Sequence, residues 1–458
     1  MKFFSTLSTL SLVGSFAAAA AAVNTTDPMY QLSTDTDYHF EVLRVLAMAP
    51  FGGSDIGETL VAAKQLVPGN FTSYYNAFYD LATRVQAEAD AIDRARYPVS
   101  ARYAYFRAAS YYRSADFYLH GNWSDPRINS LWAAQRAAFD TGLSLLPIPG
   151  VRLAVPTDDG FTVEAIWYSS GFAGPRPTVI MGTGYDGCQE ELYHGWVLGA
   201  LERGYNVLTY EGPGQATVRR EQNLGFVPNW EAVISPLVDV LMGTYAVKTN
   251  VSNSTVTRLT PADIDLAQYV QPDAIGLLGI SFGGCLAPRA AAVEHRLVAV
   301  MAVDGILTPG QTILDEMPST LINLFDAGNQ TYFDALIEEA LNSTLLTTGE
   351  RWGIQQGEWA FNTHSAFDWL HQLQDYNMTT LAANISTPTF VADAENDIFF
   401  PGQGRLLADL LRPGLATYHF FSGASGAGAH CSLGAQLLEN EVVFGWFDEV
   451  VANATSSA

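Results

Sequence analysis

The periodicity of the apolar residues along the chain changes near residue 150. Before that point, residues 74–97 and 100–121 carry apolar and aromatic side chains at helical spacing. This spacing predicts a helical lid or cap domain over residues 23–150, ended by the Pro/Gly break at residues 145–150. One helical stripe either packs as core or lines a pocket for an aromatic ligand; it consists of Ala104, Ala108, Tyr111, Ala115 and Tyr118.

After the break, short β-rich runs alternate with helical stretches. The first two runs predict a hairpin about the turn at residues 158–160, and the others are continuous apolar runs typical of buried parallel strands. Residues 151–458 are therefore expected to form an α/β domain with a mostly parallel sheet of eight strands and helices on both faces. A helical insert at residues 305–386 would lie over the strand ends, where such sheets place their sites. The expected strands are RLAVP, TVEAIWY, PTVIM, NVLTYE, AIGLLG, VAVMAVD, PTFVAD and ATYHFFS.

The composition adds a strong acidic bias to this picture. The 458 residues are 48% hydrophobic and 15% charged, as in globular proteins, and the formal net charge is −24. Such a surface repels phosphate backbones, so we expect no nucleic-acid partner and attribute the acidity to solubility. A small-molecule substrate is the expected partner, and a homodimer is left open.

The first 22 residues have the pattern of a secretory signal peptide. Lys2 is followed by an apolar stretch at residues 3–16 and a run of alanines at residues 17–22, which predicts cleavage near Ala22. No later window has the ~18 uninterrupted apolar residues of a membrane span, so we expect a secreted protein without stable membrane insertion. Glycosylation is expected at the Asn-x-Ser/Thr sites Asn24, Asn70, Asn122, Asn250, Asn253, Asn329, Asn342, Asn377, Asn384 and Asn453.

The three cysteines are too few for a disulfide framework. Cys188, Cys285 and Cys431 are expected as small buried hydrophobic residues, with a Cys188–Cys285 bridge left open. Their spacing does not predict a metal site, and we expect no metal and no cofactor.

A nucleophile is predicted where the run AIGLLG meets the next helix. The segment Gly279-Ile280-Ser281-Phe282-Gly283 is a G-x-S-x-G between a strand and a helix, as in the nucleophile elbow of serine hydrolases. The tight turn strains the serine backbone, and the flanking glycines remove side chains that would collide. Ser281 is the predicted nucleophile; the alternative is a structural turn.

A serine hydroxyl needs a base, and in this fold the order along the chain is Ser, acid, His. His430 lies in a glycine-rich loop after the last strand, whereas His419 lies inside that strand, so His430 is the predicted base. Asp397, in the loop after PTFVAD, is the predicted acid, because there it could fix the imidazole tautomer. Asp304, at the end of VAVMAVD, is the rival, and Asp393 is expected to cap a turn.

Gly182, Gly184 and Gly187 match G-x-G-x-x-G after a strand, which also fits a dinucleotide site with Glu211 on a ribose. Two carboxylates at residues 190–191 would oppose a bound diphosphate at the next helix. The loop after this strand instead supplies one backbone N–H of an oxyanion hole in serine hydrolases. We therefore predict an oxyanion hole made by the N–H of Phe282 and that of Tyr185 or Asp186.

Five segments carry a family resemblance: AIGLLGISFGG, YEGPGQ, RWGIQQGEWAF, ADAENDIFFPGQ and GAGAHCSLGA. From about residue 71 onward the chain resembles the α/β-hydrolases that include fungal polyketide-shortening (pigment-pathway) hydrolases and bacterial 2,6-dihydropseudooxynicotine hydrolase. The resemblance implies Ser281, Asp397 and His430 as a triad, a helical lid, and, in several members, cleavage of a C–C bond next to a ketone. Members of this family are commonly intracellular, and the predicted signal peptide of this chain is a departure from that pattern.

These observations predict a serine hydrolase that cleaves an ester or a ketone-adjacent C–C bond in a bulky aromatic or polyketide-like substrate. Two alternatives stay open. One is a secreted peptidase of the prolyl-oligopeptidase type, although the chain has no propeller repeat. The other is a non-catalytic binding protein on a hydrolase fold.

Overall fold

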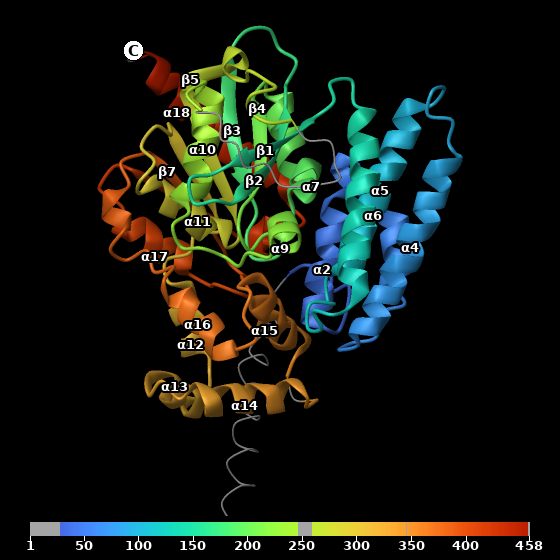
Figure 1. Ribbon diagram of the computed structural model, residues 1–458, viewed down its shortest axis with the longest axis vertical. Helices are drawn as coiled ribbons and strands as arrows, with labels where there is room; N and C mark the ends of the chain where they lie inside the picture. The colour runs from blue at the N-terminus through green and yellow to red at the C-terminus, as the bar shows by residue number, and fades with distance from the viewer. Residues whose placement is uncertain (1–27, 246–258, 345, 457–458) are drawn as a thin grey trace, which may run out of the picture.

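A single eight-stranded sheet forms the centre of the molecule in the computed structural model, which describes residues 28–245, 259–344 and 346–456 (Figure 1). The predicted signal peptide and the sites Asn24, Asn250 and Asn253 lie outside the described residues. The strand order is β1-β2-β4-β3-β5-β6-β7-β8. The strands are Val151–Pro156 (β1), Thr162–Tyr168 (β2), Arg176–Gly182 (β3), Asn206–Glu211 (β4), Val270–Ile280 (β5), Ala299–Val303 (β6), Thr389–Ala394 (β7) and Ala416–Phe421 (β8).

Strand β2 is antiparallel to both β1 and β4, and all other neighbouring strands are parallel. The predicted α/β-hydrolase fold with a mostly parallel sheet is confirmed, including the first hairpin. In parallel strands all carboxyl ends meet at one edge, so the loops after β3, β5, β6, β7 and β8 converge there.

Successive residues of the central strands enter two separate hydrophobic cores. Leu277 packs in the core that contains helices α10 (Glu231–Met242), α11 (Gly283–Ala291) and α17 (Gln403–Leu410), and Leu278 packs in the core that contains α18 (Gln436–Ser456). Because side chains of a strand alternate between faces, both faces of the sheet must be covered. This explains why these strands read as continuous apolar runs.

The N-terminal helices extend the second core away from the sheet (Figure 1). The helices are α2 (Thr36–Ala47), α3 (Ile56–Ala63), α4 (Phe71–Ala91), α5 (Pro98–Asp116) and α6 (Pro126–Ser144). Helix α2 begins at Asp35, whose side chain accepts hydrogen bonds from the backbone of Asp37 and Tyr38, a typical N-cap. The predicted stripe from Ala104 to Tyr118 is buried in this core.

A helical insert separates β6 from β7 and projects below the sheet in Figure 1. Its helices are α12 (Pro309–Asp315), α13 (Ser319–Asp326), α14 (Gln330–Leu341), α15 (Thr348–Ala360) and α16 (Ala366–Gln374). Helix α15 packs against α2, so the insert and the N-terminal helices meet over the carboxyl edge of the sheet.

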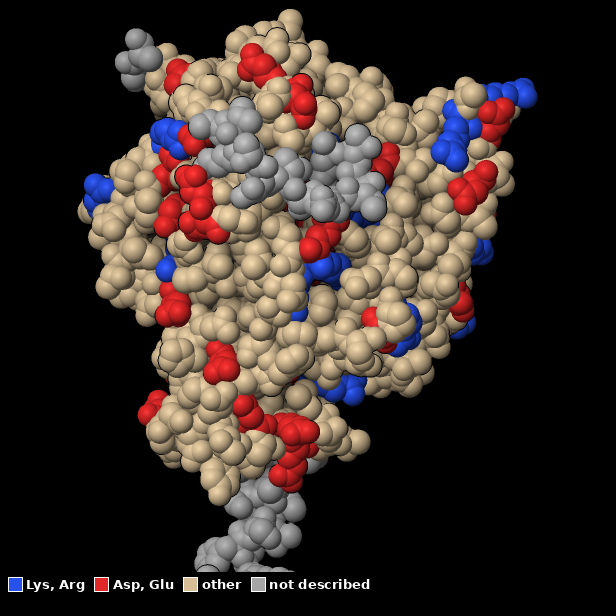
Figure 2. Space-filling model, in the orientation of Figure 1, with Lys and Arg blue, Asp and Glu red and all other residues tan. Residues whose placement is uncertain are grey.

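The acidic surface and the buried cysteines match the expectations from the sequence, whereas the bridge that was left open does not form. Acidic side chains are spread over the face shown in Figure 2, in line with the net charge of −24. Cys188, Cys285 and Cys431 are all free and buried, so the Cys188–Cys285 bridge is not formed. Of the predicted glycosylation sites that are described, Asn329 is half-buried and the others are exposed. Within residues 28–245, 259–344 and 346–456, no helix combines the length and hydrophobicity of a membrane span.

Candidate active site

Ser281 occupies a strained turn between β5 and α11. Its φ is +61°, in the left-handed region that non-glycine residues seldom adopt. A Cβ at Gly279 would collide with the carbonyl oxygen of Gly283, and one at Gly284 with that of Asp304. The glycines are thus required by the close approach of the neighbouring backbone, and they let the turn lift the hydroxyl above the sheet edge.

The imidazole of His430 lies beside this hydroxyl. His430 Nε2 is 2.8 Å from Ser281 Oγ, and Nδ1 on the opposite side is 2.9 Å from Asp397 Oδ2. Three residues that are far apart in the sequence therefore meet in one hydrogen-bonded line. This geometry allows the imidazole to accept the hydroxyl proton while the carboxylate holds the tautomer with hydrogen on Nδ1.

A second carboxyl group reaches the same ring nitrogen. Asp304 Oδ2 is 3.1 Å from His430 Nδ1 and also accepts a 2.6 Å hydrogen bond from the backbone N–H of Cys431. Asp397 Oδ1 accepts hydrogen bonds from the backbone of Phe399 and Phe400. The structure therefore brings together both the predicted acid and its rival.

The two carboxyl groups differ in their electrostatics. Burial raises the pKa of Asp304, with an opposing contribution from His430. For Asp397 burial acts in the same direction, but His430 and the two backbone N–H groups outweigh it and lower the pKa. Burial disfavours the charged imidazole of His430, yet Asp397 above all raises the pKa of His430 well above its ordinary value. The surroundings thus favour the charged form of Asp397 and disfavour that of Asp304.

The other residues weighed from the sequence lie elsewhere. Asp393 accepts hydrogen bonds from the backbone N–H of Arg405, in the first turn of α17, and from the Tyr418 hydroxyl, so it acts within the fold. His419 is in β8, half-buried against Phe390. Glu211 accepts hydrogen bonds from the backbone of Gln189 and Thr217, so both of its oxygens are engaged within the fold rather than facing a ribose.

The glycine-rich loop after β3, residues 183–188, runs beside the serine turn. A Cβ on Gly184 would lie 2.5 Å from the backbone nitrogen of Phe282, so only glycine allows this approach. Among the hydrogen bonds of the described residues, none is donated by the backbone N–H of Phe282, Tyr185 or Asp186. These predicted donors are therefore available to an oxygen atom placed near Ser281.

A cavity of about 1290 Å³ opens onto Ser281 between the sheet edge, α2 and α15. Its aromatic lining includes Phe40, Trp352 and Phe399, and the Phe399 ring meets that of His430 edge-on at 5.0 Å. Carboxyl groups of α2 also line it: burial raises the pKa of Asp37 to about 7 and that of Glu41 to about 8. The cavity can thus accept a large, mainly apolar molecule.

The residues of α2 and the partners of the glycine-rich loop were not identified from the sequence. Asp37, Phe40, Glu41 and Arg44 recur three or four positions apart on α2, and this mixed polar stripe within a buried helix is the signal that could have pointed to them.

One group of side chains has the spacing of cation ligands among the described residues: Asp304, His430 and Cys431. His430 Nδ1 is already shared by two carboxyl groups, and burial raises the pKa of the Cys431 thiol to about 12. A protonated thiol is a poor metal ligand, so the group fits a hydrogen-bond network better than a metal site.

Comparison with known proteins supports a hydrolase. The chain is 30% identical over 433 residues to Hydrolase LUC6 of Fusarium sp., covering 92% of this chain and 98% of that protein. It is 29% identical over 435 residues to 20-hydroxy-prefusarin hydrolase FUS2 of Gibberella moniliformis, covering 93% of this chain and 99% of that protein. No family model matches the sequence.

Among solved structures, 2,6-dihydroxy-pseudo-oxynicotine hydrolase superposes with a TM-score of 0.65 at 18% identity, covering 89% of this chain and 95% of that one. This likeness shows a shared fold. Because its identity to LUC6 extends over nearly the whole of both proteins, the chain belongs to the α/β-hydrolase family that contains the fungal hydrolases LUC6 and FUS2.

Proposed function

We propose that this hydrolase uses Ser281 as nucleophile, His430 as general base and Asp397 as the group that orients the imidazole. The observation that carries the proposal is the 2.8 Å contact between His430 Nε2 and Ser281 Oγ, at a serine whose backbone is held at φ +61°. The peptidase and the non-catalytic alternatives have no comparable observation in their favour.

The proposed reaction begins when His430 takes the proton of Ser281 and the serine oxygen attacks a substrate carbonyl. The N–H groups of Phe282 and of the loop at Tyr185 or Asp186 then stabilise the negative oxygen of the tetrahedral intermediate. His430 returns its proton to the leaving group, which is an alkoxide from an ester or an enolate when the bond is C–C. Water attacks the acyl enzyme by the same route and releases the acid.

The substrate class is inferred from the cavity. A volume of about 1290 Å³ with an aromatic lining suits a bulky aromatic or polyketide-like molecule better than a short-chain ester. The names of the relatives, among them a hydrolase of 20-hydroxy-prefusarin, support a place in fungal secondary metabolism.

The test of this function is hydrolysis of chromogenic aryl esters and of an aryl 1,3-diketone by the wild-type protein and by Ser281→Ala. We expect the wild type to turn over at least one of the two classes and Ser281→Ala to lose it, with an unchanged melting temperature. Activity that survives in Ser281→Ala would refute the assignment. Diketone cleavage without ester cleavage would settle the bond type.

Secretion is part of the proposal, on the basis of the sequence pattern at residues 1–22. Expression of the full chain in a eukaryotic secretory host should yield a protein in the medium that begins near residue 23 and loses mass on treatment with an endoglycosidase. Retention of the full-length chain inside the cell would contradict secretion.

A further inference from the structure

The loop at residues 183–188 has little internal structure of its own. Within the loop, Thr183 Oγ1 donates a hydrogen bond to the carbonyl oxygen of Gly187, and the loop lies between β3 and α7 (Gln189–Leu192) without being part of either. Its backbone nevertheless has to lie beside the N–H of Phe282 for an oxyanion hole to form. The position of the loop must therefore be fixed from outside.

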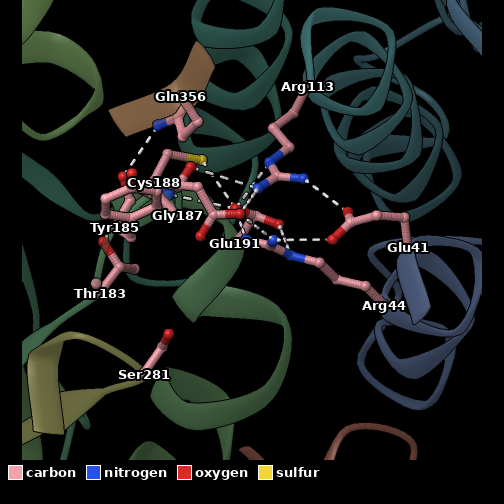
Figure 3. A network of polar contacts seen from close by, with 12 residues as sticks. Glu41, Arg44, Arg113, Thr183, Tyr185, Gly187, Cys188, Glu191, Ser281 and Gln356 are labelled. Carbon is pink, nitrogen blue, oxygen red and sulfur yellow. Dashed lines mark hydrogen bonds and ion pairs between the residues drawn. The ribbon is translucent and has the colours of Figure 1, made fainter. Parts of the chain in front are cut away.

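Two arginines of the N-terminal helices reach the loop and the start of α7 (Figure 3). Arg44, on α2, donates to Asp186 Oδ2 at 2.7 Å and to both oxygens of Glu191 at 3.0 and 3.1 Å. Arg113, on α5, lies 2.9 Å from Glu191 Oε2 and 3.4 Å from the carbonyl oxygen of Asp186. Each guanidinium thus spans the loop and the following helix.

This ion cluster is largely shielded from water. The exposed fractions of the side chains are 17% for Arg44, 8% for Arg113, 15% for Asp186 and 12% for Glu191. In such surroundings charge-assisted hydrogen bonds are stronger and more rigid than on the surface, and a guanidinium fork fixes two partners at once. Arg113 also lies 3.6 Å from Glu41, which adds a third carboxyl group to the cluster.

The cluster adds to neutral contacts on the same loop. From α15, Gln356 donates to the carbonyl oxygen of Tyr185 at 3.0 Å, and from α6, Gln135 donates to the sulfur of Cys188 at 3.0 Å. The backbone N–H of Cys188 also donates to Glu191, a carboxylate of the ion cluster. The loop is thereby held by helices from both the N-terminal region and the insert, and among the described residues the charged side chains that bind it are those of the ion cluster.

We infer that Arg44 and Arg113 are positioning residues, which hold Asp186 and Glu191 so that the backbone N–H groups of the loop face the oxyanion beside Ser281. The N-terminal helices then contribute to the chemical step and not only to the cavity. This inference rests on the proposed serine-hydrolase function. Figure 3 shows both guanidinium groups converging on Glu191.

Arg113→Lys is the sharpest test, because Arg113 is not among the described residues that line the substrate cavity. Lysine keeps the positive charge and loses the fork. We expect kcat for an aryl ester to fall about 10- to 100-fold with KM within about 2-fold, since a small misplacement of catalytic groups costs this much. The affinity for an arylboronic acid, which mimics the tetrahedral intermediate, should fall by the same factor as kcat.

A second readout is independent of activity. Amide hydrogen exchange in the peptide that covers residues 183–188 should be faster in Arg113→Lys than in the wild type. If Arg113→Lys does not fold, Arg44→Lys and Glu191→Gln are measured by the same criteria.

Arg107→Lys is the matched control. Arg107 is also on α5 and forms a 3.1 Å ion pair with Glu58, on α3, away from the loop. Wild-type kcat and exchange in Arg113→Lys, or losses no larger than those of the control, would overturn the inference. A rise in KM alone would also overturn it. A wild type that neither hydrolyses esters nor binds a fluorophosphonate would instead overturn the proposed function, and the inference with it.

Discussion

At the residue scale, His430 is the residue on which the site depends, since its ring contacts one hydroxyl and two carboxyl groups. Asp397 and Asp304 follow the neighbouring strands β7 and β6, whose carboxyl ends lie side by side. In the sequence Asp304 ends a predicted strand and Asp397 lies in the loop after the next one, and the choice between them depends on how these loops fold. The structure shows that both reach Nδ1.

Because Asp304 can also accept the Nδ1 hydrogen, we predict that Asp397→Asn lowers kcat by about 100-fold, less than the roughly 10⁴-fold loss known when a triad acid has no substitute. The double variant Asp397→Asn/Asp304→Asn should reach that larger loss. The measurement is kcat for an aryl ester in Asp397→Asn, in Asp304→Asn and in the double variant. A loss in Asp397→Asn that already equals that of the double variant would show that Asp304 offers no substitute.

Gly184→Ala should remove the oxyanion hole while leaving the nucleophile in place. The new Cβ would lie 2.5 Å from the backbone nitrogen of Phe282, so the loop must move away from it. We predict a fall in kcat of about 100-fold or more, the effect of losing one oxyanion donor. Gly445→Ala, where a Cβ has open space, is the control and should keep wild-type kcat. Equal kcat values for the two variants would argue against the assigned role of the loop.

At the scale of elements, α2 is the part of the site that sequence patterns concealed. Its charged residues Asp37 and Glu41 are buried together with apolar residues such as Val42, whereas a typical surface helix keeps its charged residues on the side that faces solvent. Strands and the serine turn were predictable because apolar runs and glycines respond to local constraints. The buried carboxyl groups of α2 depend on partners from other helices, since Asp37 accepts a hydrogen bond from the Tyr118 hydroxyl and Glu41 lies 3.6 Å from Arg113.

The buried carboxyl of Asp37 on α2 predicts a measurable pH dependence of stability. Burial raises its pKa from 3.8 to about 7, with the Tyr118 hydroxyl opposing and the charge of Asp35 adding to the rise. Between these values the folded chain binds more protons than the unfolded chain, so the free energy of unfolding falls as pH rises from about 4 to 7.

We predict that Asp37→Asn makes this fall shallower, by up to about 1.4 kcal/mol for each pH unit. The measurement is urea unfolding at several pH values between 4 and 8, with the exposed variant Asp80→Asn as control. Parallel pH curves for Asp37→Asn and the wild type would contradict the assignment of a buried, protonated carboxyl at this position.

At the scale of the whole molecule, loops at the edge of the sheet carry the proposed catalytic residues, and two separate helical regions enclose the cavity beside them. The eight-stranded architecture was predictable from the alternation of apolar β-rich runs with helical stretches along the sequence. The runs are continuous because the two hydrophobic cores on the sheet faces require apolar side chains on both sides of each central strand. The contact between α15 of the insert and α2 of the N-terminal helices was not predictable. The sequence pattern of each helix does not indicate which distant helix it packs against.

This enclosure predicts selectivity for large esters. Phe40 lies on α2 against Phe399 at 5.5 Å and 6.3 Å from the ring of His430, so it bounds the cavity near the reacting centre. Phe40→Ala should raise KM for a naphthyl ester about 10-fold, the loss of one large apolar contact, and should leave KM for an acetyl ester of a small alcohol within about 2-fold. Equal changes for both esters would indicate a disturbed fold instead of a lost contact.

If Ser281 is an activated nucleophile, as we propose, an electrophilic probe should label it covalently. The wild type and His430→Ala are incubated with a fluorophosphonate, digested and analysed by mass spectrometry. We predict one adduct, on Ser281, in the wild type and a strongly reduced rate of labelling in His430→Ala. An unlabelled Ser281 in the folded wild type, or labelling that is equally fast without the imidazole, would contradict it.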